Sequence, residues 1–484
     1  MYQVEAWSAL RRARRDAGGG IRWPHVSGTV WALGFTSLFT DVSSEMVATV
    51  LPVYLVLYLG LTPFQFGIVD GLYHGVTALL RLASGVAVDR TGRSKEIALA
   101  GYGASAASRL GMLAAGASWP LIAGVVAFDR AAKGARAVPR DVLISLSSRP
   151  DGLATAFGVH RALDSAGAML GPLVALAILG ALPNAFDVVF VASFSIAVVG
   201  LGVLMLFVNN AEPSTASAPM AVAPPAAPAR TAPTAVAPAA APTRTAPAAA
   251  RSGAPGTADG GPAAGERPHA LAGGRPAGPA ASSGRGATGA LATRILRVPG
   301  LLRLTVAATL LGAATVSDGF LYLLLQREAG FSPGLFPLLY VGTSGCYLAL
   351  AVPAGRLADR IGRQRAFLAG YGLLAAAYAA TMQPGIGLPG VAACLLLLGA
   401  HYALTDGVLM AFASGRLSPE RRGSGLALIT TAASLARLLA SVAFGTLWTR
   451  YGAGTAVPVF LIALVAAMAV AAFLLRDTAG RNQR

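Results

Sequence analysis

Acidic residues occur deep inside the apolar stretches of this chain, where a charge is costly. Asp41 and Glu45 lie four residues apart in the first apolar stretch and so share one face of a helix, with Asp41 near its middle. A charged side chain at the centre of a bilayer costs about 2.5–3.5 kcal/mol on insertion scales, so it usually faces a cavity and has a function. A carboxylate that exchanges cationic partners can bind and release a proton, and this pair therefore favours proton transfer.

Other apolar stretches carry ionisable side chains with the same potential. His160, Arg161 and Asp164 fall within one helical turn, so either cation can reach the carboxylate. The remaining candidates are Asp70, His74 and Arg81 along one stripe of the second stretch, Arg130 and Lys133 in the fourth, Asp318 in the seventh, and His401 and Asp406 in the tenth. Each is a candidate for proton coupling or solute binding, and the alternative is a static ion pair between helices.

The fourth stretch ends in a row of charges. Asp129, Lys133, Arg136 and Arg140 recur at spacings of three and four and predict one cationic stripe on a helix. This stripe could attract an anionic solute, or its long side chains could reach the lipid head groups.

Composition places these residues in a membrane protein. The chain has 484 residues, of which 55% are hydrophobic and only 12% are charged, and its mean hydropathy is +0.62. Soluble domains carry about a quarter charged residues, so a soluble enzyme is excluded. The same apolar content excludes a chain that is disordered throughout. A polytopic α-helical membrane protein remains.

Twelve stretches are long enough to span a bilayer as helices. They are residues 29–57, 66–88, 97–116, 119–137, 153–181, 186–208, 300–325, 335–357, 366–383, 389–413, 424–447 and 455–475. None has the form of a cleaved signal peptide. The formal charge of +17 is concentrated in an N-terminal arm (1–28), in the loops of one side and in the C-terminal tail (477–484). By the positive-inside rule both termini are cytoplasmic, and the basic charge reports topology rather than nucleic-acid binding.

Residues 209–298 differ abruptly from the rest. This segment consists mainly of Ala, Pro, Gly, Arg and Thr and has no aromatic residue. It cannot bury a core, so we predict a disordered cytoplasmic linker between an N-terminal half (29–208) and a C-terminal half (299–476).

Deleting residues 215–290 should therefore leave the activity of the chain nearly unchanged. The measurement is that activity in a properly inserted deletion protein beside the full chain. Loss of activity in such a protein would contradict the prediction that this segment is only a tether.

The two halves repeat each other. Residues 60–93 align with 330–363 at a constant offset of 270, without a gap. The identical positions include Gly60, Pro63, Phe66, Gly75, Gly85, Asp89, Arg90, Gly92 and Arg93, which align with Gly330, Pro333, Phe336, Gly345, Gly355, Asp359, Arg360, Gly362 and Arg363. Such a duplication predicts two six-helix bundles facing a central cavity.

The repeated segments resemble a known loop signature. Gly85-Val-Ala-Val-Asp-Arg-Thr-Gly-Arg-Ser-Lys95 and Gly355-Arg-Leu-Ala-Asp-Arg-Ile-Gly-Arg-Gln-Arg365 are similar to the loops after helices two and eight of the major facilitator superfamily. Arg130-Ala-Ala-Lys-Gly134 resembles its fourth-helix motif. Gly167-Ala-Met-Leu-Gly-Pro172 resembles its antiporter motif, whose usual following glycine pair is missing here. The run Asp41-Val-Ser-Ser-Glu-Met46 resembles a prokaryotic subgroup whose substrates are mostly undefined.

The resemblance implies an all-α transporter with twelve transmembrane helices in two six-helix bundles. It also implies that the loop signatures form a cytoplasmic gate, in which Asp89 meets helix N-terminal N–H groups or a neighbouring arginine. Helices one and four line the same half-cavity in this superfamily, so Asp41 with Arg130 is the leading proton-coupling pair. Asp164 with His160 or Arg161 is the second.

Proton-coupled export of a small solute is the function that these features favour, in the inner membrane of a prokaryote, by a monomer without cofactor or bound metal. One alternative is uptake of an organic anion. Another is divalent-metal export, if His74, His160 and His401 converge. The weakest is a receptor or scaffold that has lost transport, which would not need the buried carboxylates. An enzyme is not expected, because no phosphate loop or nucleophile–base motif occurs.

Overall fold

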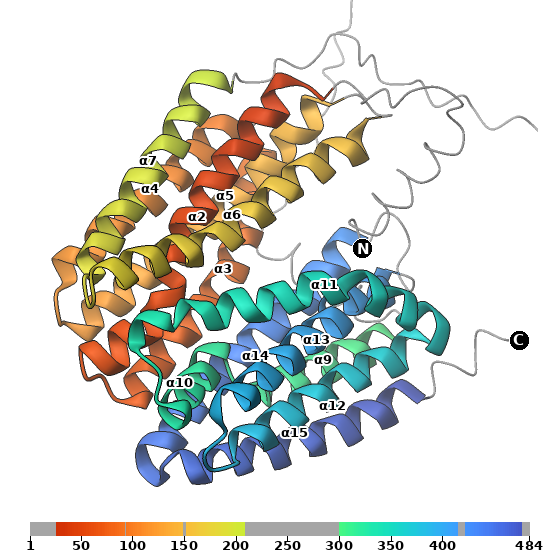
Figure 1. Ribbon diagram of the computed structural model, residues 1–484. Helices are drawn as coiled ribbons and strands as arrows, with labels where there is room; N and C mark the ends of the chain where they lie inside the picture. Colours follow the sequence, from red (N-terminus) through yellow and green to blue (C-terminus); the bar gives the residue numbers. More distant parts are fainter. Residues whose placement is uncertain (1–25, 92, 149–151, 209–299, 415–421, 477–484) are drawn as a thin grey trace, which may run out of the picture. The chain divides into compact units, whose positions relative to one another are not determined.

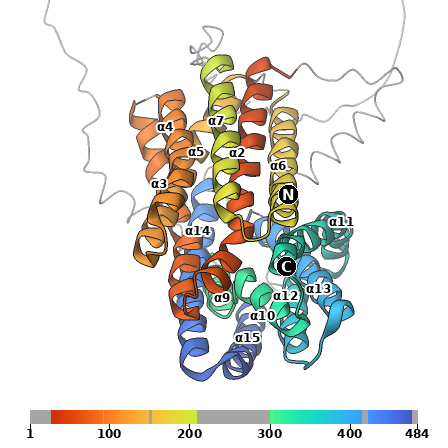
Figure 2. The ribbon, with the colours of Figure 1, turned by 60° about the vertical axis from the view of Figure 1, so that its left-hand side comes forward.

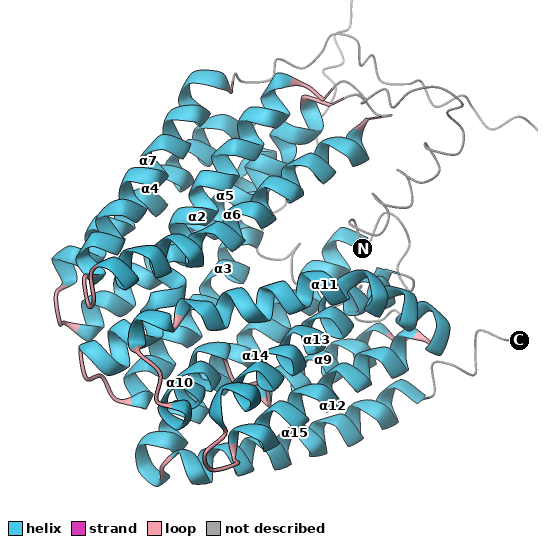
Figure 3. Cartoon of the chain, viewed as in Figure 1, coloured by secondary structure: helices cyan, strands magenta, loops and turns pink. Residues whose placement is uncertain are grey.

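The computed structural model describes residues 26–91, 93–148, 152–208, 300–414 and 422–476. The predicted linker at 209–298, the N-terminal arm before residue 26 and the tail after residue 476 lie outside the described residues. Within the described ranges the chain consists of helices and short loops, and no strand occurs there (Figure 3). The predicted all-α class is confirmed.

The helices of each half follow the predicted order of spans (Figure 1). The N-terminal half contains α2 (Gly28–Val53), continued by the π-helical turn η1 (Tyr54–Tyr58), then α3 (Pro63–Thr91), α4 (Ser94–Ala115), α5 (Trp119–Leu146), α6 (Leu153–Ala181) and α7 (Phe186–Phe207). The C-terminal half contains α9 (Leu301–Ala313), α10 (Asp318–Ala329), the short η2 (Pro333–Leu335), α11 (Pro337–Ile361), α12 (Arg363–Thr381), α13 (Gly387–Ser414), α14 (Arg422–Tyr451) and α15 (Ala453–Arg476).

Helix pairing repeats between the halves, as the duplication predicts. In the first half α2 packs on α6 and α7, and α5 packs on α3 and α4; Figure 2 shows α2, α6 and α7 side by side. In the second half α9 packs on α14 and α15, and α13 packs on α11 and α12. Each of these pairs is the equivalent of one in the other half. The repeated sequence therefore encodes a repeated bundle.

Eight of the helical spans in the described residues are by themselves long and apolar enough to cross a bilayer. The other four, α3, α4, α5 and α12, are less apolar. Polar side chains on α5 are nonetheless buried: Asp129, Arg130 and Arg136 are 3–4% exposed. These charges face neighbouring helices, so the bundle and not the lipid surrounds them. Because charged residues of α5 can be buried against neighbouring helices, α5 continues as a helix to Leu146, beyond the predicted end of its span at residue 137.

The seventh span is interrupted, whereas the sequence predicts one continuous stretch from 300 to 325. α9 ends at Ala313 and α10 begins at Asp318. Ser317 caps α10 by accepting a hydrogen bond from the Gly319 N–H at 3.3 Å. The backbone N–H of Val316 donates to the Tyr378 hydroxyl at 2.6 Å. A broken helix is tolerated inside a membrane only where the freed backbone groups find such partners.

The two halves contact each other through α3 with α14 and through α6 with α11. A stripe of glycines at positions 67, 71 and 75 lets α3 approach α14 closely. A Cβ at Gly67 would lie 2.5 Å from the Ser441 carbonyl oxygen, and one at Gly71 would lie 2.9 Å from that of Leu438. Small residues at this spacing permit direct backbone packing in membranes. The stripe is absent from the equivalent face of α11, where Pro337 and Val341 stand at two of the three positions.

The loop-signature residues lie where α3 meets α4 and where α11 meets α12. Gly85, Asp89 and Arg90 fall in the last turns of α3, and Gly92 lies outside the described residues. Arg93 is the N-cap of α4.

In the second copy Gly355, Asp359 and Arg360 belong to α11. Gly362 joins the helices with a φ of +93°, which favours glycine. The first residue of α12, Arg363, lies 3.8 Å from the Asp359 carboxylate (Nη2 to Oδ1), and both are exposed enough for water to weaken the pair. The gate itself stays a prediction.

Candidate functional site

Two glycines bring the acidic residues of α2 and α6 together. A Cβ at Gly167 would lie 2.4 Å from the Leu38 carbonyl oxygen, and one at Gly171 would lie 2.7 Å from that of Val42. The backbones of α2 and α6 therefore touch on either side of Asp41. Because Asp164 precedes Gly167 by three residues, it lies on the same face of α6. The antiporter-like motif, including Pro172 within α6, thus positions a pair of carboxyl groups.

Asp41 and Asp164 lie beside each other at this crossing, close enough for their carboxyl groups to interact electrostatically and to share a hydrogen bond. A carboxylate has no hydrogen to donate, so such a bond forms only when one of the two groups is protonated. Asp41 is 8% exposed. The two carboxyl groups are called the carboxyl pair below.

Four cations from α5 and α6 surround the carboxyl pair. Asp41 Oδ1 lies 3.7 Å from Lys133 Nζ and 3.8 Å from Arg136 Nη2. Asp164 lies 3.6 Å from Arg140 Nη1 and 3.7 Å from Arg161 Nη1. These separations are longer than hydrogen bonds, so each carboxyl has two nearby cations and is tightly held by neither.

Glu45 shares Lys133 with Asp41, since its carboxylate lies 3.8 Å from Nζ. The prediction that Asp41 and Glu45 share one face is therefore confirmed. The predicted Asp41–Arg130 pair is wrong for this conformation. Arg130 instead bonds its sequence neighbour Asp129 through Nε at 2.9 Å and through Nη2.

Arg130, Asp129 and Arg109 form a separate buried cluster. Arg109 Nη2 lies 3.1 Å from Asp129 Oδ1. Ser105 and Ser108 donate hydrogen bonds to the same oxygen at 2.7 and 3.1 Å. All three charged residues are 3–4% exposed. The carboxylate is fully satisfied, which is the pattern of a structural ion pair between α4 and α5. Arg109 was not among the sequence candidates.

The three histidines do not converge on a common point. His160 is fully buried, and its Nε2 lies 3.5 Å from the Ser37 hydroxyl rather than beside Asp164. His401 is bonded through Nδ1 to the Gly370 carbonyl at 2.9 Å, not to Asp406. No group of three His, Cys, Asp or Glu side chains able to hold a metal occurs among the described residues. The convergence that metal export requires is therefore not found there.

A second acidic site lies between the two halves, in a cavity of about 250 Å3. It is lined by residues of both: Glu45, Ala48, Leu51, Pro52, Phe66, Asp70, Tyr73, His74, Thr315, Val316, Ser317, Asp318, Gly319, Tyr340, Tyr402, Arg437 and Ser441. The broken seventh span contributes Thr315, Val316 and Ser317 of its gap to this wall. The interruption of the seventh span therefore forms part of the cavity wall.

Hydroxyl groups of the second half hold two acids of the cavity, Asp70 and Asp318. Ser317 donates to Asp70 Oδ1 at 2.7 Å, and Ser441 donates to Oδ2. Asp70 belongs to α3, so these bonds join the halves. The Tyr402 hydroxyl lies 2.8 Å from both oxygens of Asp318. His74 Nε2 lies 3.9 Å from Asp70 Oδ1, which confirms that these two residues of the predicted stripe are neighbours.

Sequence reasoning missed Arg437, which lines this cavity from α14. The available signal was a single arginine in the middle of the apolar stretch 424–447. Two of the predicted candidates, Arg81 and Asp406, are instead exposed.

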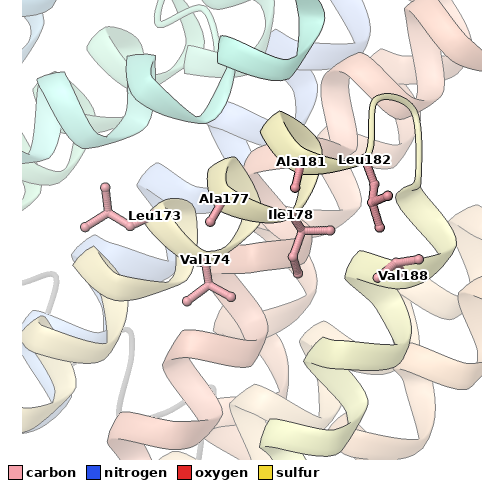
Figure 4. A pocket seen from close by; sticks show the side chains of 7 residues that line it. All are labelled: Leu173, Val174, Ala177, Ile178, Ala181, Leu182 and Val188. Atoms are coloured by element: carbon pink, nitrogen blue, oxygen red, sulfur yellow. The ribbon is translucent and has the colours of Figure 1, made fainter.

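A second hollow, between α6 and α7, is purely apolar (Figure 4). Its seven lining residues run from Leu173 to Ala181 on α6, continue through Leu182 and end at Val188 on α7. No side chain there can bind a proton or an ion. The candidate site is therefore the carboxyl pair together with the cavity between the halves.

Comparison with known proteins identifies the family. The sequence profile of the Major Facilitator Superfamily matches residues 33–324 and 304–484. The chain belongs to this superfamily. Its members are multi-pass membrane proteins that carry small solutes across membranes.

The superfamily relatives leave the solute undefined. An uncharacterized MFS-type transporter of Methanocaldococcus jannaschii is 34% identical over 193 residues, which cover 39% of this chain and 46% of that one. An uncharacterized protein of Mycobacterium tuberculosis is 34% identical over 157 residues, covering 32% of this chain and 38% of that one. The match thus spans less than half the length of either curated relative.

Solved transporters share the fold of this superfamily member. The nucleoside transporter NupG superposes with a TM-score of 0.68 at 11% identity, over 93% of this chain and all of that chain. The peptide transporter POT superposes with a TM-score of 0.63 at 14% identity, over 92% of this chain and 94% of that one. At such low sequence identity, the superpositions show only that the fold is shared.

Replacing Gly167 by Leu should abolish transport and weaken folding. The new side chain would meet the Leu38 backbone, which cannot move aside as a flexible side chain can. α2 and α6 would separate, and the carboxyl pair with them. Thermal unfolding in detergent and transport in vesicles measure the two effects. Gly180→Leu on the same helix is the control, because its Cβ would meet nothing within 4 Å. Equal behaviour of the two variants would contradict the prediction.

Proposed function

We propose that this transporter is a proton-coupled antiporter that exports a small solute by alternating access. The observation that carries the proposal is the carboxyl pair, because Asp41 and Asp164 lie side by side among cations and can share a hydrogen bond only when one of them is protonated. A site that can hold a proton in one conformation, and can lose it in another, is what coupling to a proton gradient requires.

The surrounding cations supply a link between the proton and the helices. When the shared proton leaves, the pair carries a second negative charge. That charge attracts Lys133 and Arg136 of α5 more strongly toward Asp41, and Arg140 toward Asp164. The separations of 3.6–3.8 Å leave room for these contacts to shorten. Loss of the proton therefore draws α5 toward α2 and α6, and return of the proton releases it.

The direction follows from the proposed location. In a prokaryotic plasma membrane with both chain termini in the cytoplasm, the proton gradient points inward. Protons that enter through the carboxyl pair then drive a solute outward. The gating role of the loop signatures, with Asp89 and Asp359 at the ends of α3 and α11, belongs to the same proposal.

The alternatives have less support. Uptake of an organic anion by the cationic stripe of α5 would need free cations, but Lys133, Arg136 and Arg140 each contact a carboxylate. A receptor or scaffold has no need of a shared proton in its interior.

Inside-out membrane vesicles energised to an acidic interior test the proposal. Amino acids, organic cations, organic acids, sugars and divalent metals are added separately while a pH-sensitive dye reports proton release. We expect one class to cause dequenching in the wild type and none in Asp41→Asn. If every class is silent with the protein verified in the membrane, or if the variant responds like the wild type, the antiport proposal is wrong.

A further inference from the structure

The cavity between the halves contains charges of both signs that form no close ion pair with each other. Among the described residues no lysine or arginine lies within 4.0 Å of the carboxylates of Asp70 or Asp318. His74, 3.9 Å from Asp70, is a cationic partner only when protonated. Hydroxyl donors hold both carboxylates in place. These bonds orient the two groups and leave their charge available to a ligand.

Arg437 is a cationic side chain of the same cavity with an unpartnered hydrogen-bond donor. Its side-chain Nε is buried and has no hydrogen-bond partner in the described part of the chain. Its electrostatic neighbours are the hydroxyls of Tyr371 and Tyr402 and, more weakly, the carboxylates of Asp406 and Asp318; neither carboxylate forms an ion pair with it at 4.0 Å or less. A buried donor without an acceptor is rare in native proteins and is commonly explained by a missing ligand, ion or water. The Nε of Arg437 therefore lacks an acceptor, and no carboxylate pairs closely with its charge.

Apart from Thr315 and Glu45, whose carboxylate lies 3.8 Å from Lys133 Nζ, the rest of the wall is mostly aromatic and apolar. Phe66, Tyr73 and Tyr340 line the cavity, and the Arg130 guanidinium lies 4.0 Å from the centre of the Tyr73 ring, so one ring face is already covered. The volume of about 250 Å3 admits a small molecule only. An occupant with a short apolar body and two charged ends matches this lining.

We infer that the cavity binds a small zwitterion of the amino-acid type, with its ammonium group at Asp70 and Asp318 and its carboxylate at Arg437. The inference rests on the proposed transport function and names the class of solute carried. A cation alone would leave the Arg437 donor without an acceptor. An anion alone would leave both carboxylates without a counter-charge. Only a solute with both charges satisfies the three groups together.

Equilibrium binding to the purified full chain in detergent, without any gradient, tests the inference. The probes are phenylalanine, phenethylamine, which lacks the carboxylate, and 3-phenylpropionate, which lacks the ammonium group; alanine serves as a smaller zwitterion. We expect a zwitterion to bind at least about tenfold more tightly than either singly charged analogue, because loss of one desolvated charge contact commonly costs a decade or more in affinity. This comparison uses the wild type alone and depends on no variant folding.

Matched variants assign the two ends. Asp318→Asn should weaken binding of the zwitterion about tenfold and leave 3-phenylpropionate unaffected. Arg437→Gln should weaken the zwitterion similarly and leave phenethylamine unaffected. Asp187→Asn, an exposed acid at the start of α7, is the control. If either singly charged analogue binds as tightly as phenylalanine, or if neither zwitterion binds, the inference is wrong.

The two proposals fail separately. Binding without a gradient reports only the cavity, whereas proton release in vesicles reports only coupling. Zwitterion binding with no proton release would retain the site and remove antiport. Proton release caused by another class of solute, with no zwitterion binding, would retain antiport and remove this site.

Discussion

Asp41→Asn is expected to reduce proton-coupled transport to the level of vesicles without the protein, while the variant inserts and folds normally. Asparagine has nearly the size of aspartate and can still form a hydrogen bond to Asp164, but it cannot gain or lose a proton near neutral pH. The contacts to Lys133 and Arg136 lose their charge attraction, yet these pairs are already 3.7–3.8 Å long. Solute-driven proton release in energised inside-out vesicles measures the effect. Wild-type coupling in the variant would remove Asp41 from the mechanism.

If Asp41 and Asp164 share one proton, a second mutational result is expected. Asp164→Asn should abolish coupling to the same extent as Asp41→Asn, and the double variant should lose nothing further. Groups that act as one unit give strongly non-additive effects, whereas independent sites give effects that add. Asp187→Asn should behave as the wild type, because its carboxylate is exposed at the start of α7. Additive losses in the double variant would contradict a common proton.

Asp129→Asn is expected to have the largest effect on stability, about 3–5 kcal/mol in the free energy of unfolding. Asp129 neutralises Arg109 and Arg130, and all three are almost completely buried. Without the carboxylate, two guanidinium groups remain in the interior with no counter-charge. Reversible unfolding in detergent, monitored by the helical circular dichroism signal, measures the change. Unchanged unfolding would show that water or lipid head groups reach these arginines.

Asp41 and Asp129 are therefore two buried acids with different expected roles, one in coupling and one in stability. Asp129 accepts two charge-assisted contacts and two serine hydrogen bonds, so no capacity remains for exchange. Asp41 has only long contacts to cations, and a bond to the neighbouring Asp164 would depend on a proton. Substitution of Asp129 should change unfolding, and substitution of Asp41 should change coupling. The reverse result for the pair would contradict both assignments.

Local features of the sequence were sufficient to predict the class, the order of the spans and the duplication. Apolar stretches of bilayer length and a repeat at constant offset are properties of consecutive residues, and they need no knowledge of which helices meet. The glycines of the motif at 167–172 were also visible in the sequence. Their effect, a backbone contact that places Asp164 beside Asp41, became evident only from the packing of α6 on α2.

Partner choice among the charges could not be predicted, because it depends on helix rotation. Successive residues of an α-helix point about 100° apart, so a small error in rotation exchanges one partner for another. Arg130 contacts the adjacent Asp129 instead of Asp41, while Lys133 and Arg136, at most two turns further along α5, reach Asp41. The break at residues 314–317 likewise depends on a distant hydroxyl, that of Tyr378.

The sequence by itself determined a twelve-span membrane protein of two repeated halves, since hydrophobicity and repeated motifs act along the chain. Only the tertiary structure decided which acids lie side by side, which are locked in ion pairs and which charges face the cavity. Arg437 shows the reason most directly. A lone arginine in an apolar stretch becomes a candidate ligand only when Asp70 of another helix, and Asp318 at a broken one, are placed on the same wall.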